Sequence, residues 1–458
     1  MMKIAVYILA VSWAFFASGL SFAAEMKVGG EFKTTAMWYD NWNGQDAGSD
    51  NVSEDDFSIR TRARFIFRYS ASDSLSAVIR LQYGASGGGM TWGDPNSGGQ
   101  IDTDANNIIY IRRLYLEFKW PDTKVLFQAG KLALSMPNQF GSPVLGADAA
   151  TFAVSSPITG NVSVAAGFAR AVDLNRSGET GSSVRDEWDH VYLSLPLKFD
   201  GLQVTPFGDL SFLGNGIPPS YVLGGYTGGI KTPGGTVYED DYVYPWWAGL
   251  SLKMTALDPW TVQGDFNYGQ ISDGDSVNDR SGWFADLAVS YKGLDFMVPQ
   301  LMGMYSSGED DDVGNGSERM PVVRDDWVFG TWYYGGSDLL SGDLTTSEMA
   351  AGTWCAGLGL TEMTFIDKLS HDLYVLYIAG TNDSGILDKA PKSLKHLVEL
   401  TDEDYLVEID FNHKYMIYEQ LAAILELTYV FNGIDEKVWG IADESDIWKI
   451  GLGLNYNF

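Results

Sequence analysis

Hydrophobic and polar residues alternate with a period of two along most of this chain. Segment 57–69 shows the pattern most clearly: its odd positions are almost all apolar, and most of its even positions are arginine. Successive side chains of a β-strand point to opposite faces, so this strand has one apolar face and one cationic face. A soluble sheet would bury the apolar face and leave the arginines to pair with carboxylates in water. A transmembrane barrel would turn the apolar face to lipid and the arginines to an aqueous lumen.

The same alternation recurs to the end of the chain in segments of about ten residues, each followed by a turn or a loop. The predicted strands are 26–39, 57–69, 75–85, 107–119, 123–131, 150–156, 161–170, 186–198, 202–212, 242–254, 260–270, 282–292, 296–306, 351–361, 371–380, 404–415, 419–431 and 447–458. They number about 18, an even count that suits a barrel. The strand at 150–156 is the least certain assignment. If it is not a strand and a neighbouring segment is reassigned as well, the count becomes 16.

The connections between these strands alternate between short and long. Short ones are predicted at 155–160, 199–201, 292–295 and 416–418, and long ones at about 40–56, 171–185, 213–241, 307–349 and 381–403. Transmembrane barrels have short periplasmic turns and long external loops. We therefore predict an all-β fold: one antiparallel transmembrane β-barrel domain over residues 24–458. The segment VVRDDWVFGTWYYG in the longest loop is open to two interpretations, an extra external hairpin or a plug.

The N-terminus is typical of a secretory signal peptide. Lys3 precedes an apolar run at 4–16, and Ser21 and Ala23 form a small-x-small cleavage pattern, so residues 1–23 are expected to be removed. The run is too short to span a bilayer as a helix. The protein is therefore expected to be exported, with the bacterial outer membrane as its destination.

Charge and cysteine content narrow the choice of partners. The formal net charge is −30, which makes the chain a poor candidate for nucleic-acid binding. Its one cysteine, Cys355, excludes an intramolecular disulfide. Many acids lie in the predicted long loops, as solvated charge or, alternatively, as ligands for divalent cations shared with lipopolysaccharide. The acids at 310–312 lack the spacing of a calcium loop, so we predict no metal site there and no cofactor.

The last strand, IWKIGLGLNYNF, has an outward row with aromatic residues at both ends. Such ends suit the two interfacial girdles of a lipid-facing strand. The chain closes on Phe458, with Tyr456 two residues before it. We interpret Tyr456 and Phe458 as the C-terminal signal that barrel-assembly machinery recognises, which makes that machinery and outer-membrane lipid expected partners.

Four segments carry a family resemblance: GEFKTTAMWYDNW, RLYLEFKWPDTKVLFQAGK, FIDKLSHDLYVLYIAGTND and YLVEIDFNHKYMIYEQLAAILELTYVFNG. Through them the chain resembles the outer-membrane homotrimeric porins typical of sulfate-reducing bacteria, nearly end to end and most closely after residue 350. The resemblance implies a homotrimer of general diffusion pores for small solutes and ions.

A barrel of about 18 strands is wide enough to leave an aqueous channel. General porins narrow such a channel by folding the third external loop inward, and here that loop is predicted at 132–149. Its two prolines and two glycines suit a loop packed inside a barrel. The candidate constriction residues are Pro137, Asn138, Phe140 and Asp148.

The opposite wall of the lumen is predicted to be cationic. The candidate selectivity residues share the inward parity of adjacent strands: Arg60, Arg62, Arg64, Arg68, Arg80 and Arg113. Guanidinium groups stay charged at any relevant pH, and a ring of them favours anions, so weak anion selectivity is expected. Alternatively, inward acids such as Glu117, Glu408 and Asp410 pair with the arginines, which then only brace the wall.

Other classes of protein fit less well. An outer-membrane enzyme would need a nucleophile with a base, but the four histidines, His190, His371, His396 and His413, accompany neither a GxSxG motif nor a metal-binding pair. We therefore expect no enzyme. A substrate-specific monomeric channel for small anions or organic acids shares the fold and the arginine row, and it remains the alternative function.

Overall fold

The computed structural model describes the barrel in segments. The described residues are 25–41, 56–84, 90–94, 100–102, 109–174, 185–217, 242–272, 279–312, 314–329, 339, 352–389, 400–441 and 444–458. The predicted signal peptide at 1–23 lies outside them, as do most of the acids predicted in the first long loop.

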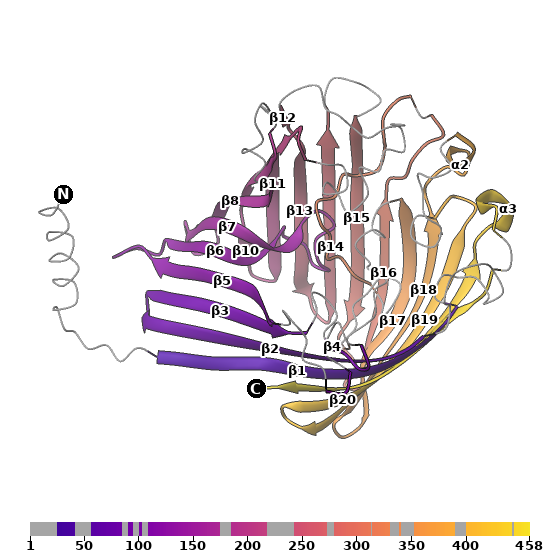
Figure 1. Cartoon of the computed structure of the whole chain (residues 1–458), viewed down its shortest axis with the longest axis horizontal. Helices are drawn as coiled ribbons and strands as arrows, with labels where there is room; N and C mark the ends of the chain where they lie inside the picture. The colour runs from indigo at the N-terminus through magenta and orange to yellow at the C-terminus, as the bar shows by residue number, and fades with distance from the viewer. Residues whose placement is uncertain are drawn as a thin grey trace, which may run out of the picture.

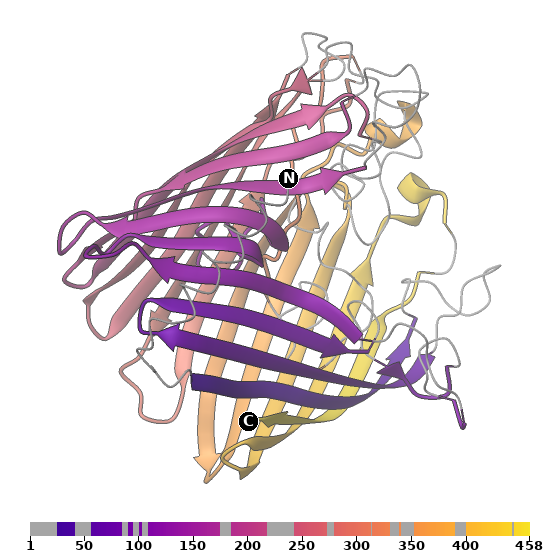
Figure 2. The ribbon, with the colours of Figure 1, turned by 60° about the vertical axis from the view of Figure 1, so that its left-hand side comes forward.

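The described strands form one closed antiparallel barrel (Figures 1 and 2). Its staves are β1 (Glu25–Asp40), β2 (Asp56–Ser72), β3 (Leu75–Tyr83), β5 (Ile109–Lys119), β6 (Leu126–Ser135), β7 (Gly146–Pro157), β8 (Ser163–Asp173), β9 (Glu187–Ser194), β11 (Leu202–Gly214), β13 (Trp246–Leu257), β14 (Trp260–Ile271), β15 (Arg280–Tyr291), β16 (Val298–Ser306), β17 (Thr353–Ile366), β18 (Leu369–Gly380), β19 (Tyr405–Tyr418), β20 (Leu421–Gly433) and β21 (Ile447–Asn457). Three short strands pair with these staves: β4 (Met90–Thr91) with β2, and β10 (Leu197–Phe199) and β12 (Tyr242–Val243) with β11. The barrel of 18 staves confirms the predicted fold and the predicted strand count.

Several strand boundaries were predicted wrongly by three or more residues, among them those of β6, β7, β9, β13, β17 and β19. The strand expected at 123–131 runs over Leu126–Ser135, because Thr123 extends the preceding turn: its hydroxyl donates to Trp120 O and accepts from Val125 N. The strand expected at 150–156 begins at Gly146 and ends at Pro157, so the short turn predicted at 155–160 lies at 158–162.

Side chains alternate between the two faces of the wall. In β21, Leu452 and Leu454 are exposed at 51% and 46%, whereas Gly451 and Gly453, which alternate with them, are buried. Leu287 and Leu301 on the far side of the barrel are likewise 50% and 65% exposed. A monomeric soluble protein rarely exposes so broad an apolar surface, whereas the wall of a membrane barrel requires one.

Aromatic rings on the outward face gather at both ends of the staves. Ring pairs at the loop end are Trp246–Tyr268, Trp283–Tyr305 and Trp354–Tyr377, and pairs at the turn end are Phe118–Phe127, Trp260–Tyr291 and Phe296–Phe365. Amphipathic rings prefer the two interfaces of a bilayer. The two girdles therefore mark the part of the wall that crosses the membrane.

The short helices α2 (Ile386–Lys389) and α3 (Glu436–Trp439) lie at one end of the barrel (Figure 1). In α2, Lys389 Nζ lies 2.6 Å from Asp311 Oδ2, and this hydrogen bond raises the pKa of Lys389. The exposed contact links the loop after β16 to the loop after β18. No helix among the described residues is long and apolar enough to cross a membrane.

The barrel closes where β21 pairs with β1, and the C-terminal residue lies at this seam. Phe458 N donates to Gly30 O, and Gly30 N donates to Phe458 O at 2.9 Å. The Phe458 ring packs against Tyr456 and edge-on against Phe65 of β2. The predicted assembly residues therefore also contribute to the closure of the folded barrel, while their recognition by assembly machinery stays a prediction.

We expect Gly30→Ala to weaken this seam. A Cβ at Gly30 would lie 2.2 Å from Arg64 O and 2.8 Å from the Phe458 ring, and such overpacking typically costs about 1–3 kcal/mol. Urea unfolding in lipid vesicles, followed by gel mobility without boiling, measures the loss. The matched control is Gly208→Ala on β11, where the nearest atom lies 3.7 Å away. Equal stability of the two variants would contradict this account of the seam.

Candidate pore constriction

The hairpin of β6 and β7 leaves the barrel wall part-way along its length. The ladder between β5 and β6 ends at Leu114 and Lys131, and the ladder between β7 and β8 begins at Ala150. Between these points, described residues of β6 and β7 pair only with each other. Segment 132–149, predicted as the third external loop, is therefore the part of the hairpin that bends inward, and its tip at 136–145 is called loop 3 below.

Loop 3 lies against the inner face of β13 and β14, strands that are not neighbours of its own hairpin. Gln139 N donates to Asp265 Oδ2 at 2.6 Å, and Gln139 Nε2 donates to Ser251 Oγ at 2.7 Å. Asn267 Nδ2 donates to Asn138 Oδ1 at 3.0 Å. These contacts confirm that the third loop folds inward.

The predicted constriction residues occupy different places in the hairpin. Pro137 lines a cavity of about 220 Å³ beneath loop 3, and Asn138 and Phe140 lie in the loop itself. Asp148 was assigned to the loop, but it lies on β7 and pairs with Ala133 of β6. Asp148 is therefore in the strand-paired part of the inward hairpin, because that segment keeps its pairing up to Gly146, and its role at the constriction stays a prediction.

The loop between β16 and β17, called loop 7 below, also enters the barrel. Three of its backbone amides donate to loop 3: Val323 N to Val144 O, Asp326 N to Ser142 O and Val328 N to Phe140 O, at 2.8–2.9 Å. Gly141 of loop 3 has φ +87° and lies so close to Asp326 that a Cβ would meet its carbonyl oxygen at 2.1 Å. The two loops thus form one packed layer inside the barrel.

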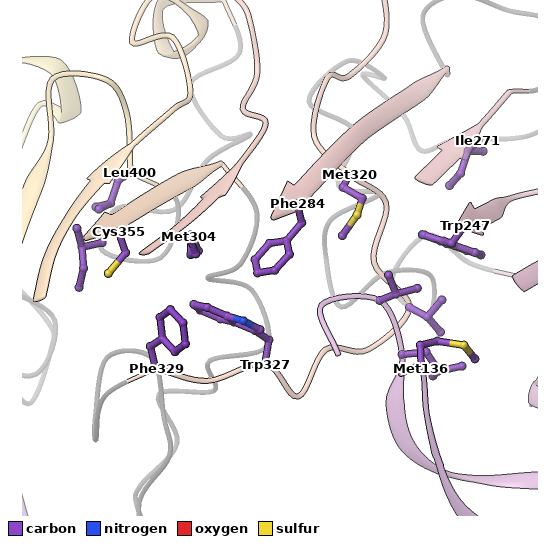
Figure 3. Close-up of a cluster of buried hydrophobic side chains, with 14 of the residues drawn as sticks. Met136, Trp247, Ile271, Phe284, Met304, Met320, Trp327, Phe329, Cys355 and Leu400 are labelled. Carbon is purple, nitrogen blue, oxygen red and sulfur yellow. The ribbon is translucent and has the colours of Figure 1, made fainter. Parts of the chain in front are cut away.

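Apolar side chains fix loop 7 to the wall. Trp327, 1% exposed, lies between Phe284 of β15 and Phe329, with ring centroids 5.3 and 4.6 Å away (Figure 3). Trp247 Nε1 donates to Pro321 O at 2.7 Å. Described residues of VVRDDWVFGTWYYG therefore lie inside the barrel, and the interpretation as an external hairpin was wrong for residues 322–329.

Further along, loop 7 reaches another part of the wall. Leu339 is buried with Met37 of β1 and Ile424 of β20, and its N–H donates to Glu426 Oε1 at 3.2 Å. The loop therefore contacts β15 at Trp327 and the seam region at Leu339, on well-separated staves. Loop 3 and residues 321–327 of loop 7 contact β13, β14 and β15, and β2, β3 and β5 form a separate side of the barrel.

That second side carries the arginines. Arg60, Arg62, Arg64 and Arg68 lie on β2, Arg80 on β3 and Arg113 on β5, and Arg112 beside it makes a seventh. The sequence pattern missed Arg112 because strict alternation turns it outward. A bulge between the pairs Arg80–Arg113 and Leu81–Ile111 leaves Arg112 as the extra residue, and it joins Arg113 at one carboxylate. These seven residues are called the arginine wall below.

Among the described residues, three carboxylates form ion pairs with the arginine wall. Glu31 Oε1 of β1 lies 3.1 Å from Arg62 and 3.0 Å from Arg64. Asp148 accepts from Arg113 Nε at 2.7 Å and lies 3.0 Å from Arg112, which ties the inward hairpin to β5. A carboxylate between two guanidiniums is a strong, charge-assisted arrangement.

The third carboxylate is Glu117 of β5, which lies 3.2 Å from Arg68 as the sequence suggested. The other two suggested acids, Glu408 and Asp410, lie on β19, where Asp410 accepts from the Thr428 hydroxyl. The three carboxylates contact five of the seven arginines, Arg62, Arg64, Arg68, Arg112 and Arg113. Both roles considered for the arginines, bracing and selectivity, are therefore compatible with the geometry.

The histidines are spread over the barrel. His190 faces inward, fully buried, with Nδ1 2.8 Å from Asp209, while its neighbour Asp189 pairs with Arg170. His371 and His413 meet on β18 and β19 with their Nδ1 atoms 2.6 Å apart. His396 lies outside the described residues. No group of three His, Cys, Asp or Glu side chains suited to a metal ion occurs among the described residues.

Comparison with known proteins supports the architecture. No protein-family model matches the chain, and no curated protein matches it significantly. Among solved structures, it is similar to OccK8 (OprE) of Pseudomonas aeruginosa, with TM-score 0.53 and 11% identity over 95% of this chain and 98% of that one. It is also similar to the outer membrane protein OprD of the same organism, with TM-score 0.52 and 12% identity over 96% and 95%. The fold is that of an outer-membrane porin-type barrel.

A third similar structure is OccAB3 of Acinetobacter baumannii, with TM-score 0.52 and 11% identity over 94% of this chain and 99% of that one. At such low identity the agreement concerns the path of the chain. The arginine wall and the contacts of loops 3 and 7 described above rest on this chain's own residues.

Proposed function

We propose that this protein is an outer-membrane channel for passive diffusion of small hydrophilic solutes and ions, with a weak preference for anions. The observation that carries the proposal is the exposure of arginine side chains on the inner face of the barrel. The Arg68, Arg112 and Arg113 side chains are 40%, 34% and 32% exposed although they belong to the inner face. Water, and therefore ions, can reach these guanidinium groups.

The mechanism is electrostatic. Guanidinium groups keep their charge at any relevant pH, and cationic rings favour anions at contact distance. The acidic external loops act from farther away, and charges in solution are screened over about 8 Å at physiological ionic strength. The narrow part of the channel should therefore dominate selectivity despite the net negative charge of the whole chain.

A substrate-specific channel for small organic anions is a second candidate, favoured by the position of loop 7. Two loops inside one barrel leave less room than one, and they place apolar and polar groups opposite the arginines. Arg80 lies among the paired arginines and has no hydrogen-bond or ion-pair partner among the described residues. Its guanidinium is suited to a carboxylate that enters from the lumen.

Location and assembly complete the proposal. We propose export through cleavage after residue 23, insertion by the barrel-assembly machinery and residence in lipid that includes lipopolysaccharide. The homotrimer implied by the porin resemblance belongs to the proposal too, and cross-linking in native membranes would test it. An absence of enzymatic activity is also proposed, and hydrolysis assays on detergent-solubilised protein would test that.

Liposome swelling with the purified protein tests channel function. A diffusion channel should admit small sugars and organic anions at rates that rise linearly with concentration. Saturation by one class of organic anion would favour the substrate-specific candidate. No swelling and no conductance from protein with the gel mobility of a folded barrel would overturn the proposed function.

A further inference from the structure

Two acidic side chains, Asp265 and Asp286, lie where loops 3 and 7 meet the barrel wall. They are direct register partners on β14 and β15 and are only 5% and 6% exposed. Asp265 Oδ2 accepts from the loop 3 amide Gln139 N at 2.6 Å. Asp286 Oδ2 accepts from the loop 7 indole Trp327 Nε1 at 2.7 Å. Each loop is thus anchored by one member of the same carboxyl pair.

The remaining oxygen of each carboxyl group is unusual. Asp265 Oδ1 and Asp286 Oδ1 are buried and have no hydrogen-bond partner among the described residues. No described lysine, arginine or histidine lies within ion-pair distance of either group. Residues directly opposite in an antiparallel pair have Cβ atoms about 4.5–5.5 Å apart, and like charges there repel. Two carboxyl groups in one buried site cannot both ionise without a large cost.

We propose that Asp265 and Asp286 share one proton and act together as a latch that couples loop 3 to loop 7. A proton between the two carboxyl groups would satisfy both unpartnered oxygens and leave one charge in place of two. Their second oxygens would remain free to accept from Gln139 and Trp327. The latch would affect conduction only if the protein is a channel as proposed above, because the latch positions the two loops that narrow the lumen.

The described groups around the latch are neutral or are paired elsewhere. Loop 3 presents the Gln139 amide, and β13 presents the Ser251 hydroxyl. On the β16 side, the register partner of Asp286 is the apolar Met304. In loop 7, Asp326 beside Trp327 points to loop 3 instead, where it accepts from Ser142 N at 2.6 Å. On β11, Asp209 is paired with His190.

The latch predicts a linked response to pH. Loss of the shared proton places two charges in contact, and the pair separates together with the loops that it holds. Loops 3 and 7 should therefore loosen in one step as pH rises, with increased open-channel current noise. Loops held independently would respond separately or not at all.

Asparagine variants separate the shared proton from simple hydrogen bonding. In Asp265→Asn, the side-chain amide can donate to Asp286 while its oxygen still accepts from Gln139; in Asp286→Asn, the roles are exchanged. Both variants should keep the low-pH conductance and lose the pH step, whereas Asp286→Ala should be noisy at every pH. The matched control is Asp200→Asn in the exposed turn before β11, far from both loops in the sequence, which should retain the step.

Two results would overturn the latch. One is a wild-type pH step in both asparagine variants. The latch also requires an infrared band from a protonated carboxyl group in the wild-type protein near neutral pH, and either asparagine substitution should remove this band. The absence of such a band is the second overturning result. The infrared test needs no conduction, so a protein that shows the band but conducts nothing would overturn the proposed function and leave the latch intact.

Discussion

Replacing residues 319–329 of loop 7 with an equally long Gly/Ser segment is expected to raise the single-channel conductance several-fold. This segment holds Met320, Trp327 and Phe329, all buried in the layer that fills one side of the lumen. Gly/Ser chains behave as flexible coils and bury little apolar surface, so the replacement would not stay packed on loop 3. The expected result is a wider, noisier channel.

Planar-bilayer recording measures this effect, and gel mobility without boiling checks that the barrel itself is folded. Trp327→Phe serves as the milder companion variant, because it removes one hydrogen bond, worth about 1 kcal/mol, and keeps most of the apolar contact. It should raise the noise more than the mean conductance. A folded loop 7 replacement with wild-type conductance would show that loop 7 does not limit permeation.

Removing a carboxylate from the arginine wall is expected to strengthen the preference for anions. Glu31→Gln deprives Arg62 and Arg64 of their shared counter-charge, and the wall gains one net positive charge. Asp148→Asn does the same for Arg112 and Arg113. A charge that acts at contact distance in a narrow pore changes the local ion concentration strongly, so each variant should raise the anion-to-cation permeability ratio about two-fold or more.

The two acidic positions differ in their second effect. Asp148 also connects the inward hairpin to β5, so Asp148→Asn should add current noise that Glu31→Gln lacks. The matched control is Asp200→Asn in an exposed turn, which removes the same charge outside the lumen. An unchanged permeability ratio in both lumen variants would mean that the arginine wall does not control selectivity.

Much of the barrel could be predicted from the sequence because its cause is local. Strand alternation depends on neighbouring residues, and it placed Arg60, Arg62 and Arg64 on the face opposite Phe65. The alternation of short and long connections likewise predicted at which strand ends the short turns and the long loops would lie. A closed membrane barrel repeats these local rules at every stave.

The interior of the lumen could be predicted only in part. Loop 3 was expected inside the barrel, but its bond from Gln139 to Asp265 joins residues 126 positions apart, which periodicity cannot register. The entry of loop 7 depends on Trp327 fitting beside Phe284, a match of shapes between distant segments. Arg112 required a bulge that breaks the very alternation used to find the strands.

The zero-current potential under a salt gradient tests the central claim most directly. It should be measured for the wild-type protein, for Arg60→Ser/Arg62→Ser/Arg64→Ser, and for the control Arg170→Ser/Lys198→Ser/Lys292→Ser, which removes the same charge from exposed positions. The account predicts that the wild type and the control prefer anions and that the lumen variant loses this preference. A cation preference shared by all three would contradict it and would assign selectivity to the acidic loops.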